Sequence, residues 1–446
     1  MATRLGVAVL VGLSAQAHSA AAPIGGKPFV DPHHPPTYKP IEQSELAQIA
    51  LGQSVFETQW VAVGMTGIAG RVGLGSLYNA ASCNTCHNGG ERGRGPVGDG
   101  PAPNALVVQL ESPANDGSAD PTGDPVYGRV FNTSAVEGIP AEGTVVIRYS
   151  EVSGYYYPFG GQWNLRVPHY QLTALSRGPL ASHTVIKPRL APALFGVGLL
   201  EAVPESAITH GGGTQSDKQT SGVLAWHSRQ GTRLLGRLGW QGGAVSIRDQ
   251  TANAFAREMG LTSNDRSSDD CTPAESGCRR NSDAEPPEVS AELLDAVVDF
   301  VRTLAVPESP THLEKNSTGS GLFEDTGCAA CHRPILPVEL HEAGAVSESA
   351  VIAPYTDLRL HDLGMEMADE DSAGAKVVSR WRTAPLWGLG YRLGIDKHPT
   401  FLHDGRARST EEAILWHGGE ASYAKRKFVN LGPHARETLL RWLATL

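Results

Sequence analysis

Two short stretches, Cys83-Asn84-Thr85-Cys86-His87 and Cys328-Ala329-Ala330-Cys331-His332, decide how this chain folds. Each has the pattern Cys-x-x-Cys-His, in which two thiols attach one haem and the adjacent histidine, here His87 or His332, ligates its iron. Two Cys-x-x-Cys pairs that share one zinc are the alternative, but they leave both histidines without a role. We therefore expect two covalently bound haem c groups.

The N-terminus has the features of a secretory signal peptide over residues 1–21. Arg4 supplies the positive charge, and residues 5–13 form an apolar core that is too short to span a bilayer. Covalent haem attachment follows export in bacteria, so we expect a periplasmic protein without a stable membrane span. In that oxidising compartment, Cys271 and Cys278 are predicted to form a disulfide.

The composition is that of a globular, loop-rich chain of 446 residues with 51 glycines and 30 prolines. The formal net charge of -10 argues against a nucleic-acid partner. It is compatible with a small basic electron donor. The predicted fold is mainly α with irregular loops and contains two cytochrome c-like haem domains.

Four segments support this division. Glycine followed by phenylalanine precedes each haem motif, as Gly52 with Phe56 and as Gly321 with Phe323, which is typical of the first helix of a cytochrome c domain. Ser290 is predicted to cap a helix with an apolar stripe, and residues 433–446 form a terminal amphipathic helix.

The predicted first domain covers residues 22–261 and carries a β-hairpin-rich insertion at residues 107–170, where polar and apolar residues alternate. A polar linker loop follows at residues 262–288, and the second haem domain covers residues 289–446.

The two halves also repeat a second motif. Arg189-Leu190-Ala191-Pro192 in the first half matches Arg382-Thr383-Ala384-Pro385 in the second, which indicates an internal duplication. Because a guanidinium matches a carboxylate, Arg189 and Arg382 are candidates for binding haem propionates; holding only local backbone is the alternative.

Longer strings carry a family resemblance that covers roughly residues 46–446. They are Tyr355-Thr356-Asp357-Leu358-Arg359-Leu360-His361-Asp362, Phe401-Leu402-His403-Asp404-Gly405-Arg406 and Glu411-Glu412-Ala413-Ile414-Leu415-Trp416-His417. With them the chain resembles the di-haem oxidoreductases, a peroxidase-like and thiol-oxidoreductase-like family distantly related to di-haem cytochrome c peroxidases. The resemblance implies one haem in each of two cytochrome c-like domains. It also implies a calcium ion near the domain interface, without assigning its ligands.

For the second iron we predict His417 as the distal ligand. Ser409 and Glu412 form a capping box, and His417 then lies on the apolar side at the helix end. It also matches the methionine ligand of the peroxidases. Other candidates for this position are Met365, Met367, His361 and His403.

For the first iron we favour an open or exchangeable site that accepts an outside ligand; the candidate protein ligands are Met259, His183 and His227. Met259 is the protein ligand that we predict, although core packing explains it equally well. Peroxide cleavage needs an acid–base group, and Glu201 is the predicted catalytic residue, with Glu205 as the second choice.

The sequence thus predicts an exported di-haem enzyme that passes electrons from the second haem to the first. It reduces peroxide or another small oxidant with electrons from a protein or small redox donor, or it uses peroxide to oxidise a partner. Trp240, Trp381 and Trp387 are candidates for a bridging aromatic between the haems. The alternatives are a pure electron-transfer cytochrome with two six-coordinate irons and an accessory protein of metal handling.

Overall fold

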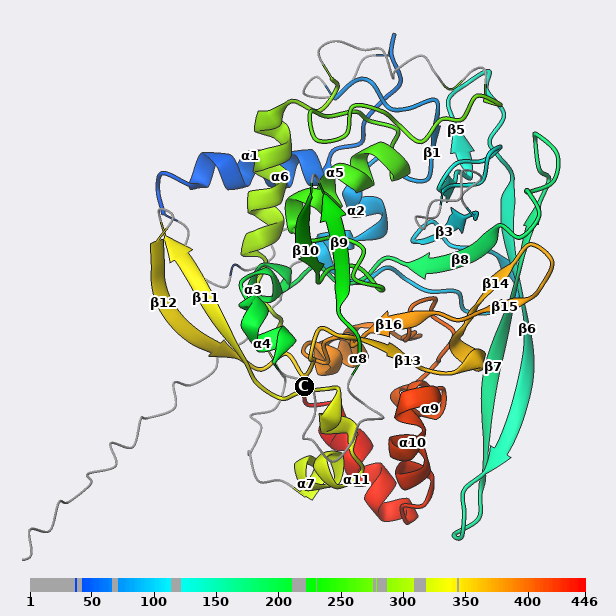
Figure 1. Ribbon diagram of the computed structural model, residues 1–446, viewed down its shortest axis with the longest axis vertical. Helices are drawn as coiled ribbons and strands as arrows, with labels where there is room; N and C mark the ends of the chain where they lie inside the picture. The colour runs from blue at the N-terminus through cyan, green and yellow to red at the C-terminus, as the bar shows by residue number, and fades with distance from the viewer. Residues whose placement is uncertain are drawn as a thin grey trace, which may run out of the picture.

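The structure is a computed structural model that describes residues 37, 42–65, 71–113, 122–210, 222–229, 231–275, 278, 287–308, 318–342 and 345–446 (Figure 1). The predicted signal peptide at residues 1–21 lies outside the described residues. None of the helices in the described part of the chain combines the length and apolar character that crossing a membrane requires.

Two helices cross in the first core. They are α1 (Leu46–Glu57) and α6 (Ala291–Thr303), which pack with α5 (Ile247–Glu258) around buried apolar side chains. A Cβ atom on Gly52 would lie 1.9 Å from the carbonyl oxygen of Ala296, so only glycine lets the two backbones approach this closely. The rings of Phe56 and Phe300 meet beside this contact at 5.4 Å.

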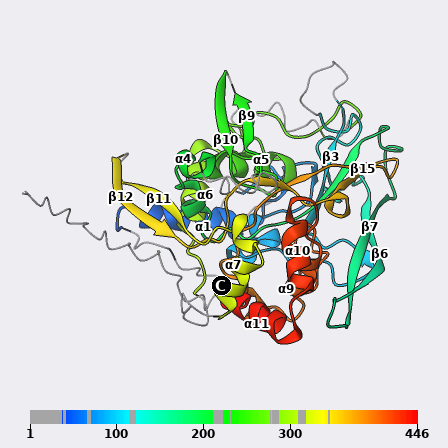
Figure 2. The same cartoon turned by 60° about the horizontal axis from the view of Figure 1, so that its bottom comes forward.

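The second core repeats this crossing with α7 (Thr318–Asp325) and α11 (Pro433–Leu443). Here Gly319 lies against Trp442, whose ring centre is 5.0 Å from that of Phe323. The glycine therefore precedes the phenylalanine by four residues in both cores. Gly321, the glycine chosen from the sequence, faces open space instead. Figure 2 shows α7 and α11 grouped with α9 (Thr410–Leu415) and α10 (Ser422–Val429).

This difference predicts opposite effects for two substitutions in one helix. Gly319→Ala places a Cβ 2.2 Å from the Cβ of Trp442, so we expect a loss of roughly 2–4 kcal/mol of unfolding free energy through overpacking. Gly321→Ala meets no atom within 4 Å and is expected to stabilise the helix by up to about 1 kcal/mol. Denaturant unfolding of the two haem-loaded variants measures both; equal midpoints would contradict the assigned crossing.

The helix at Ser290 and the terminal helix are confirmed, and the Ser290 hydroxyl accepts a hydrogen bond from the Leu293 N–H. Because α6 packs on α1 and α5, it joins the two sides of the predicted domain boundary at residue 289. The domain limits themselves stay a prediction. Cys271 and Cys278 form the predicted disulfide, with Cα atoms 5.7 Å apart.

The sequence predicted a mainly α fold, and this prediction is wrong: the structure is 29% helical and 25% strand. Two sheets hold most of the longer strands. The five-stranded sheet has the order β15-β14-β8-β3-β4, and the three-stranded sheet has the order β2-β6-β7. The bounds of these strands are β2 Gly100–Pro101, β3 Leu106–Glu111, β4 Val130–Phe131, β6 Thr144–Tyr155, β7 Gln162–Thr173, β8 Val185–Leu190, β14 Asp369–Asp371 and β15 Lys376–Val377.

Four two-stranded sheets complete the strands, and the remaining helices are short. The sheets pair β1 (Leu77–Tyr78) with β5 (Ser134–Ala135), β9 (Ala225–Arg229) with β10 (Thr232–Gly236), β11 (Leu336–Glu342) with β12 (Ala345–Ile352), and β13 (Leu360–Asp362) with β16 (Arg380–Arg382). The short helices are α2 (Cys83–Cys86), α3 (Val197–Glu201), α4 (Glu205–Thr209) and α8 (Leu389–Ile395).

The mainly-α expectation failed because it missed two hairpins, β9–β10 and β11–β12, and because strands from both halves share one sheet. In the five-stranded sheet β14 of the second half pairs with β8 of the first. Such pairing joins segments far apart in the chain, and no local pattern announces it.

The predicted hairpin is confirmed as β6–β7, although β7 runs three residues beyond the expected end at residue 170, and Figure 1 shows it as a long ribbon along one side of the molecule. It does more than cover the first half, because Tyr156 and Leu165 pack into the second core. The buried Arg166 guanidinium donates hydrogen bonds to the carbonyl oxygens of Val97, Pro96, Gly405 and Arg406. The hairpin therefore fastens the two halves together.

Candidate functional site

The first motif forms α2 and the residue after it. Cys83 packs against the first core, and the Cys86 thiol points to the carbonyl oxygen of Asn104 at 3.4 Å. Burial raises the pKa of each thiol to about 12. His87 is partly buried, and desolvation lowers its pKa to about 4, so its imidazole is neutral at pH 7 and able to bind a metal.

The second motif forms a short turn that ends at Cys331 and His332. Nδ1 of His332 donates a hydrogen bond to the carbonyl oxygen of Tyr355 at 2.9 Å. Burial, and next the neighbouring His417, lower the pKa of His332 to about 4. None of the four motif cysteines is in a disulfide.

His417 faces His332. The Ser409 hydroxyl caps α9 by accepting a hydrogen bond from the Glu412 N–H at 3.0 Å, as the capping box predicted. Two residues past the end of α9, His417 donates from Nδ1 to the carbonyl oxygen of Ala413 at 2.7 Å. The ring centres of His417 and His332 lie 6.5 Å apart, with an angle of 49° between the planes. Because both carbonyls only accept, both Nδ1 atoms carry protons and both Nε2 atoms keep free lone pairs.

The other candidates for this position are engaged or turned away. The ring nitrogens of His361 contact the carboxylates of Asp357 and Glu420, each at 2.9 Å. Burial lowers the pKa of His361, but Asp357 and the Cys331 thiol, 3.7 Å from Nδ1, raise it to about 11. His403 stacks on Trp381 at 3.7 Å. Met365 is exposed and Met367 is buried in the second core.

Near the first motif the predicted ligands are dispersed. His183 is exposed and contacts Asp371 at 3.1 Å. His227 hydrogen bonds through Nε2 to the carbonyl oxygen of Gly242 at 2.7 Å. Met259 directly follows the last residue of α5 and is buried in the first core, against which Cys83 also packs.

Glu201 is the last residue of α3, and its side chain contacts the N-terminus of α5. Its Oε1 accepts a hydrogen bond from the Ile247 N–H at 2.8 Å, and its Oε2 pairs with Arg302 at 2.9 Å. These contacts describe a helix cap and an ion pair, and they add no support for the catalytic role that the sequence predicted. Glu205 begins α4 on the surface.

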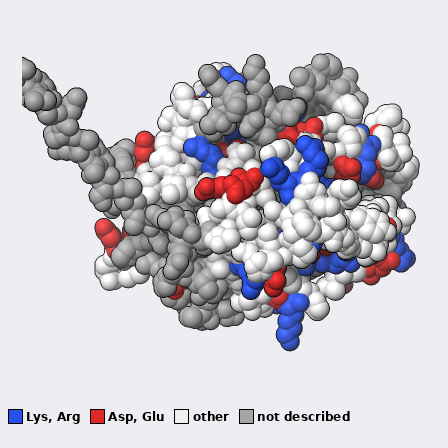
Figure 3. All heavy atoms as spheres, turned by 90° about the horizontal axis from the view of Figure 1, so that it is seen from below, with Lys and Arg blue, Asp and Glu red and all other residues white. Residues whose placement is uncertain are grey.

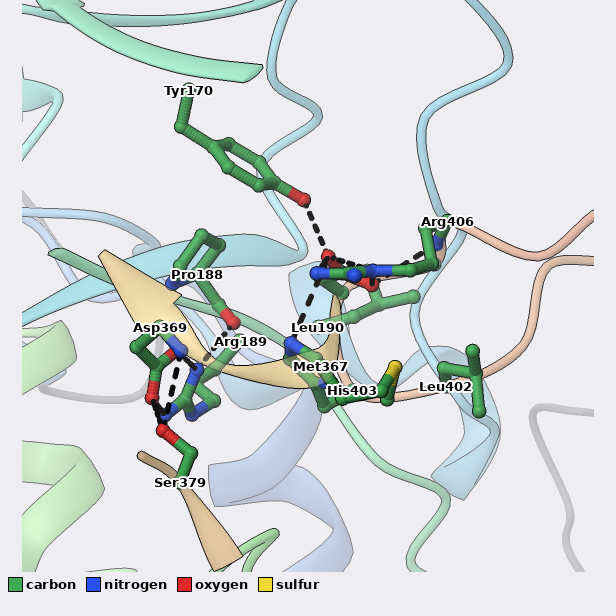
Figure 4. Close-up of polar contacts among 12 residues, drawn as sticks. Tyr170, Pro188, Arg189, Leu190, Met367, Asp369, Ser379, Leu402, His403 and Arg406 are labelled. Atoms are coloured by element: carbon green, nitrogen blue, oxygen red, sulfur yellow. Dashed lines mark hydrogen bonds and ion pairs between the residues drawn. The ribbon is translucent and has the colours of Figure 1, made fainter. Parts of the chain in front are cut away.

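Arg189 is bound to protein groups (Figure 4). It forms a two-pronged ion pair with Asp369 on β14, both contacts at 2.8 Å, and donates to the carbonyl oxygen of Pro188 and to Gln241. Its guanidinium also lies over Trp381, 4.7 Å from the ring centre. Arg189, which the sequence predicted to bind a haem propionate, is therefore already paired with the Asp369 carboxylate.

Arg382 differs from Arg189 in this respect. It is buried and donates only to backbone carbonyls, those of Gly239 and Thr383, among the described residues. Burial lowers its pKa to about 10. A buried guanidinium without a carboxylate partner fits an anionic group of a bound ligand.

The residues that follow the two copies of the Arg-x-Ala-Pro motif contact each other. Gly196 and Gly388, both at positive φ, begin α3 and α8. A Cβ on Gly196 would meet Trp387, and a Cβ on Gly388 would meet Phe195, the residue before Gly196. The two repeats thus pack against each other around a local two-fold relation, with Trp387 at their contact and Trp240 donating from Nε1 to the carbonyl oxygen of Leu190.

Comparison with known proteins identifies the family. The family model described as "Di-haem oxidoreductase, putative peroxidase" matches residues 142–446, which is more than half of the chain. The chain belongs to the di-haem oxidoreductase family. No curated protein matches it. Among solved structures it is similar to a Kuenenia stuttgartiensis hydrazine synthase pressurised with xenon, at 13% identity and a TM-score of 0.38, over 100% of both chains.

The residues of this di-haem oxidoreductase fit two haem groups. Each motif offers two unpaired thiols and one neutral histidine, and the second also has His417 opposite His332. Arg382 is linked to the second motif through two residues, because Asp357 acts on its charge and also binds His361, whose Nδ1 lies 3.7 Å from the Cys331 thiol. Two thiols and an adjacent imidazole are the groups that would hold each haem, and the Arg382 guanidinium suits a propionate.

Two residues of the oxidoreductase that the sequence did not single out belong with these sites. Arg92, five residues after His87, lies over Trp240 at 5.1 Å, and burial with the nearby Arg392 lowers its pKa to about 9. Glu258, the last residue of α5, accepts a hydrogen bond from Asn79 at 3.1 Å, and desolvation raises its pKa to about 7. The sequence could have indicated Arg92, because it is a basic residue soon after the motif. No local pattern distinguishes Glu258 from a surface glutamate.

Proposed function

We propose that this di-haem oxidoreductase is an exported, peroxidase-like enzyme with one haem c attached at each motif. When bound, the haem groups would supply the redox chemistry: electrons would enter at the second and pass to the first, where peroxide or another small oxidant is reduced. The observation that supports this division is the facing pair His332 and His417; among the described residues no histidine ring is paired in this way with His87.

The spacing of this pair suits one iron. A metal–imidazole bond is roughly 2 Å long, so two imidazoles on opposite sides of one metal have ring centres roughly 6 Å apart. The observed 6.5 Å matches, and the two Nδ1–H groups donate to carbonyls, which orients the rings. A site closed by two protein ligands transfers electrons, whereas a site with an open position binds an oxidant.

At the first site we propose Glu258 as the acid–base group in place of Glu201. It lies near enough to Cys86 to influence that thiol's pKa, and Oε2 is held by Asn79. A carboxyl with a pKa raised to about 7 takes a proton from peroxide and returns it near neutral pH.

Glu258→Gln is expected to lower peroxide turnover by about 100-fold, the size of a typical acid–base contribution. In the wild type, turnover should rise with pH through about 7, because the carboxylate must be deprotonated to accept the proton, and the variant should lack this rise. The pH profile of kcat/KM measures it. A variant that keeps the wild-type profile would remove Glu258 from the proposal.

Electron paramagnetic resonance and cyanide binding by the ferric wild type test the function. We expect one low-spin haem and one that is high-spin and binds cyanide, together with steady-state turnover of peroxide and a reduced donor. A protein with two inert low-spin haems is instead an electron carrier.

Met259 favours that second function, because it is buried in the core that contacts Cys83. If Met259 ligates the first iron, Met259→Leu would open that haem to outside ligands.

Partners and location also remain proposals. We propose periplasmic location, a redox protein or small molecule as donor, and one calcium ion, detectable by metal analysis of the purified protein. Figure 3 shows acidic and basic side chains interspersed over the described part of the face seen from below. That face therefore offers no single sign of charge to select a donor.

A further inference from the structure

Two helices of this chain are equivalent, and their equivalence assigns a role to Ala254. Before α5 the backbone forms a bridge between Leu238 and Ala244, and before α9 it forms one between Phe401 and Ala407. The first residue of each bridge lies eight residues before a serine that caps the following helix. This serine is Ser246 for α5 and Ser409 for α9. The two segments therefore align without a gap.

Buried positions agree with this alignment. Three residues after each serine lies a buried acid, Asp249 or Glu412, which accepts a hydrogen bond from the N–H of the residue before the cap. Six residues after the caps, Ala252 and Leu415 are buried in the first and second cores. Each core also contacts the first cysteine of its haem motif, Cys83 or Cys328.

Eight residues after Ser409 lies His417, and eight residues after Ser246 lies Ala254. A helix turns about 100° per residue, so Ala254 points away from the buried Ala252 and shares a face with Glu258, one turn later. Ala254 is only partly buried. Glu258 lies near enough to Cys86 to act on that thiol, so the face that Ala254 and Glu258 share is directed toward the first motif. At this position α5 continues as helix, whereas α9 ends two residues before His417.

We infer that Ala254 determines ligand access at the first haem: the methyl group leaves free the volume that the imidazole of His417 fills at the second. The inference rests on the proposed function and deepens it. The ligand class is a small oxidant of a few heavy atoms, such as hydrogen peroxide, within reach of the Glu258 carboxyl. Ala254 is thus a specificity-determining residue and takes no part in proton transfer.

The test compares three substitutions at this position in the haem-loaded protein, read by electron paramagnetic resonance and cyanide titration. Ala254→His and Ala254→Met each add a ligand atom and are expected to make the first haem low-spin and to weaken cyanide binding at least 100-fold. Ala254→Leu adds bulk without a ligand atom, so the haem should stay high-spin with cyanide binding weakened by steric contact only.

The outcomes separate this inference from the proposed function. If the wild type binds no cyanide, the proposed function fails before any variant is made. If the wild type binds cyanide and both ligand-adding variants keep a high-spin first haem with unchanged affinity, Ala254 does not face the iron and the inference is overturned. The flexible methionine keeps the test decisive should the histidine variant fail to fold.

Discussion

Replacing His417 with alanine is expected to convert the second haem from low-spin to high-spin and to let it bind cyanide and carbon monoxide. The reason is the loss of the imidazole that faces His332 at 6.5 Å, while the other histidines of this region are engaged: His361 is held by two carboxylates and His403 stacks on Trp381. Optical and paramagnetic resonance spectra of the ferric protein measure the change, which should involve one of the two haems completely.

His417→Met is the matched control. Methionine is also a haem ligand, so this variant should remain low-spin, with a midpoint potential above that of the wild type, within the ~0.8 V range that axial ligands set. A second haem whose spectrum is the same in wild type, His417→Ala and His417→Met would show that another residue ligates the iron.

Replacing Arg189 with methionine is expected to cost about 3–5 kcal/mol of unfolding free energy, because it leaves the buried Asp369 carboxylate without its partner. Although burial alone would raise the pKa of Asp369, the Arg189 charge lowers it. The stabilisation is therefore present above the ordinary carboxyl pKa of about 4 and is lost as the pH falls below it. Denaturant unfolding at pH 7 of haem-loaded protein measures the cost.

Lys187 provides the control within the same strand. Its ion pair with Glu111 also belongs to the five-stranded sheet, but the Glu111 side chain is 36% exposed while that of Asp369 is 1% exposed. Solvent screens the exposed pair, so Lys187→Ala should cost no more than about 1 kcal/mol. Equal costs at the two positions would mean that the Arg189–Asp369 pair does not hold the halves together.

The candidate site was predictable where its residues are close in the chain. The two haem motifs, the capping box at Ser409 and the position of His417 past the helix end all lie within a few turns of backbone. Helix signals of this kind depend on neighbours three or four residues away, and they transfer from sequence to structure.

Other residues could not be assigned in this way. Glu201 and Glu258 are both glutamates near helix ends, and only the fold caps α5 with one and buries the other near Cys86. Arg189 and Arg382 occupy matching motifs, yet β14 brings a carboxylate to the first alone. The sheet shared by the two halves escaped prediction for the same reason, because β8 and β14 pair across about 180 residues.

The amino-acid sequence alone determined the two haem motifs, the capped helices and the family to which the chain belongs, since each is written in residues that are neighbours along the backbone. Only the tertiary structure decided that Gly319 lies at the helix crossing and that Ala254 aligns with His417. Those relations come from segments that meet in space, where close packing and burial, which depend on distant partners, select which side chain fits.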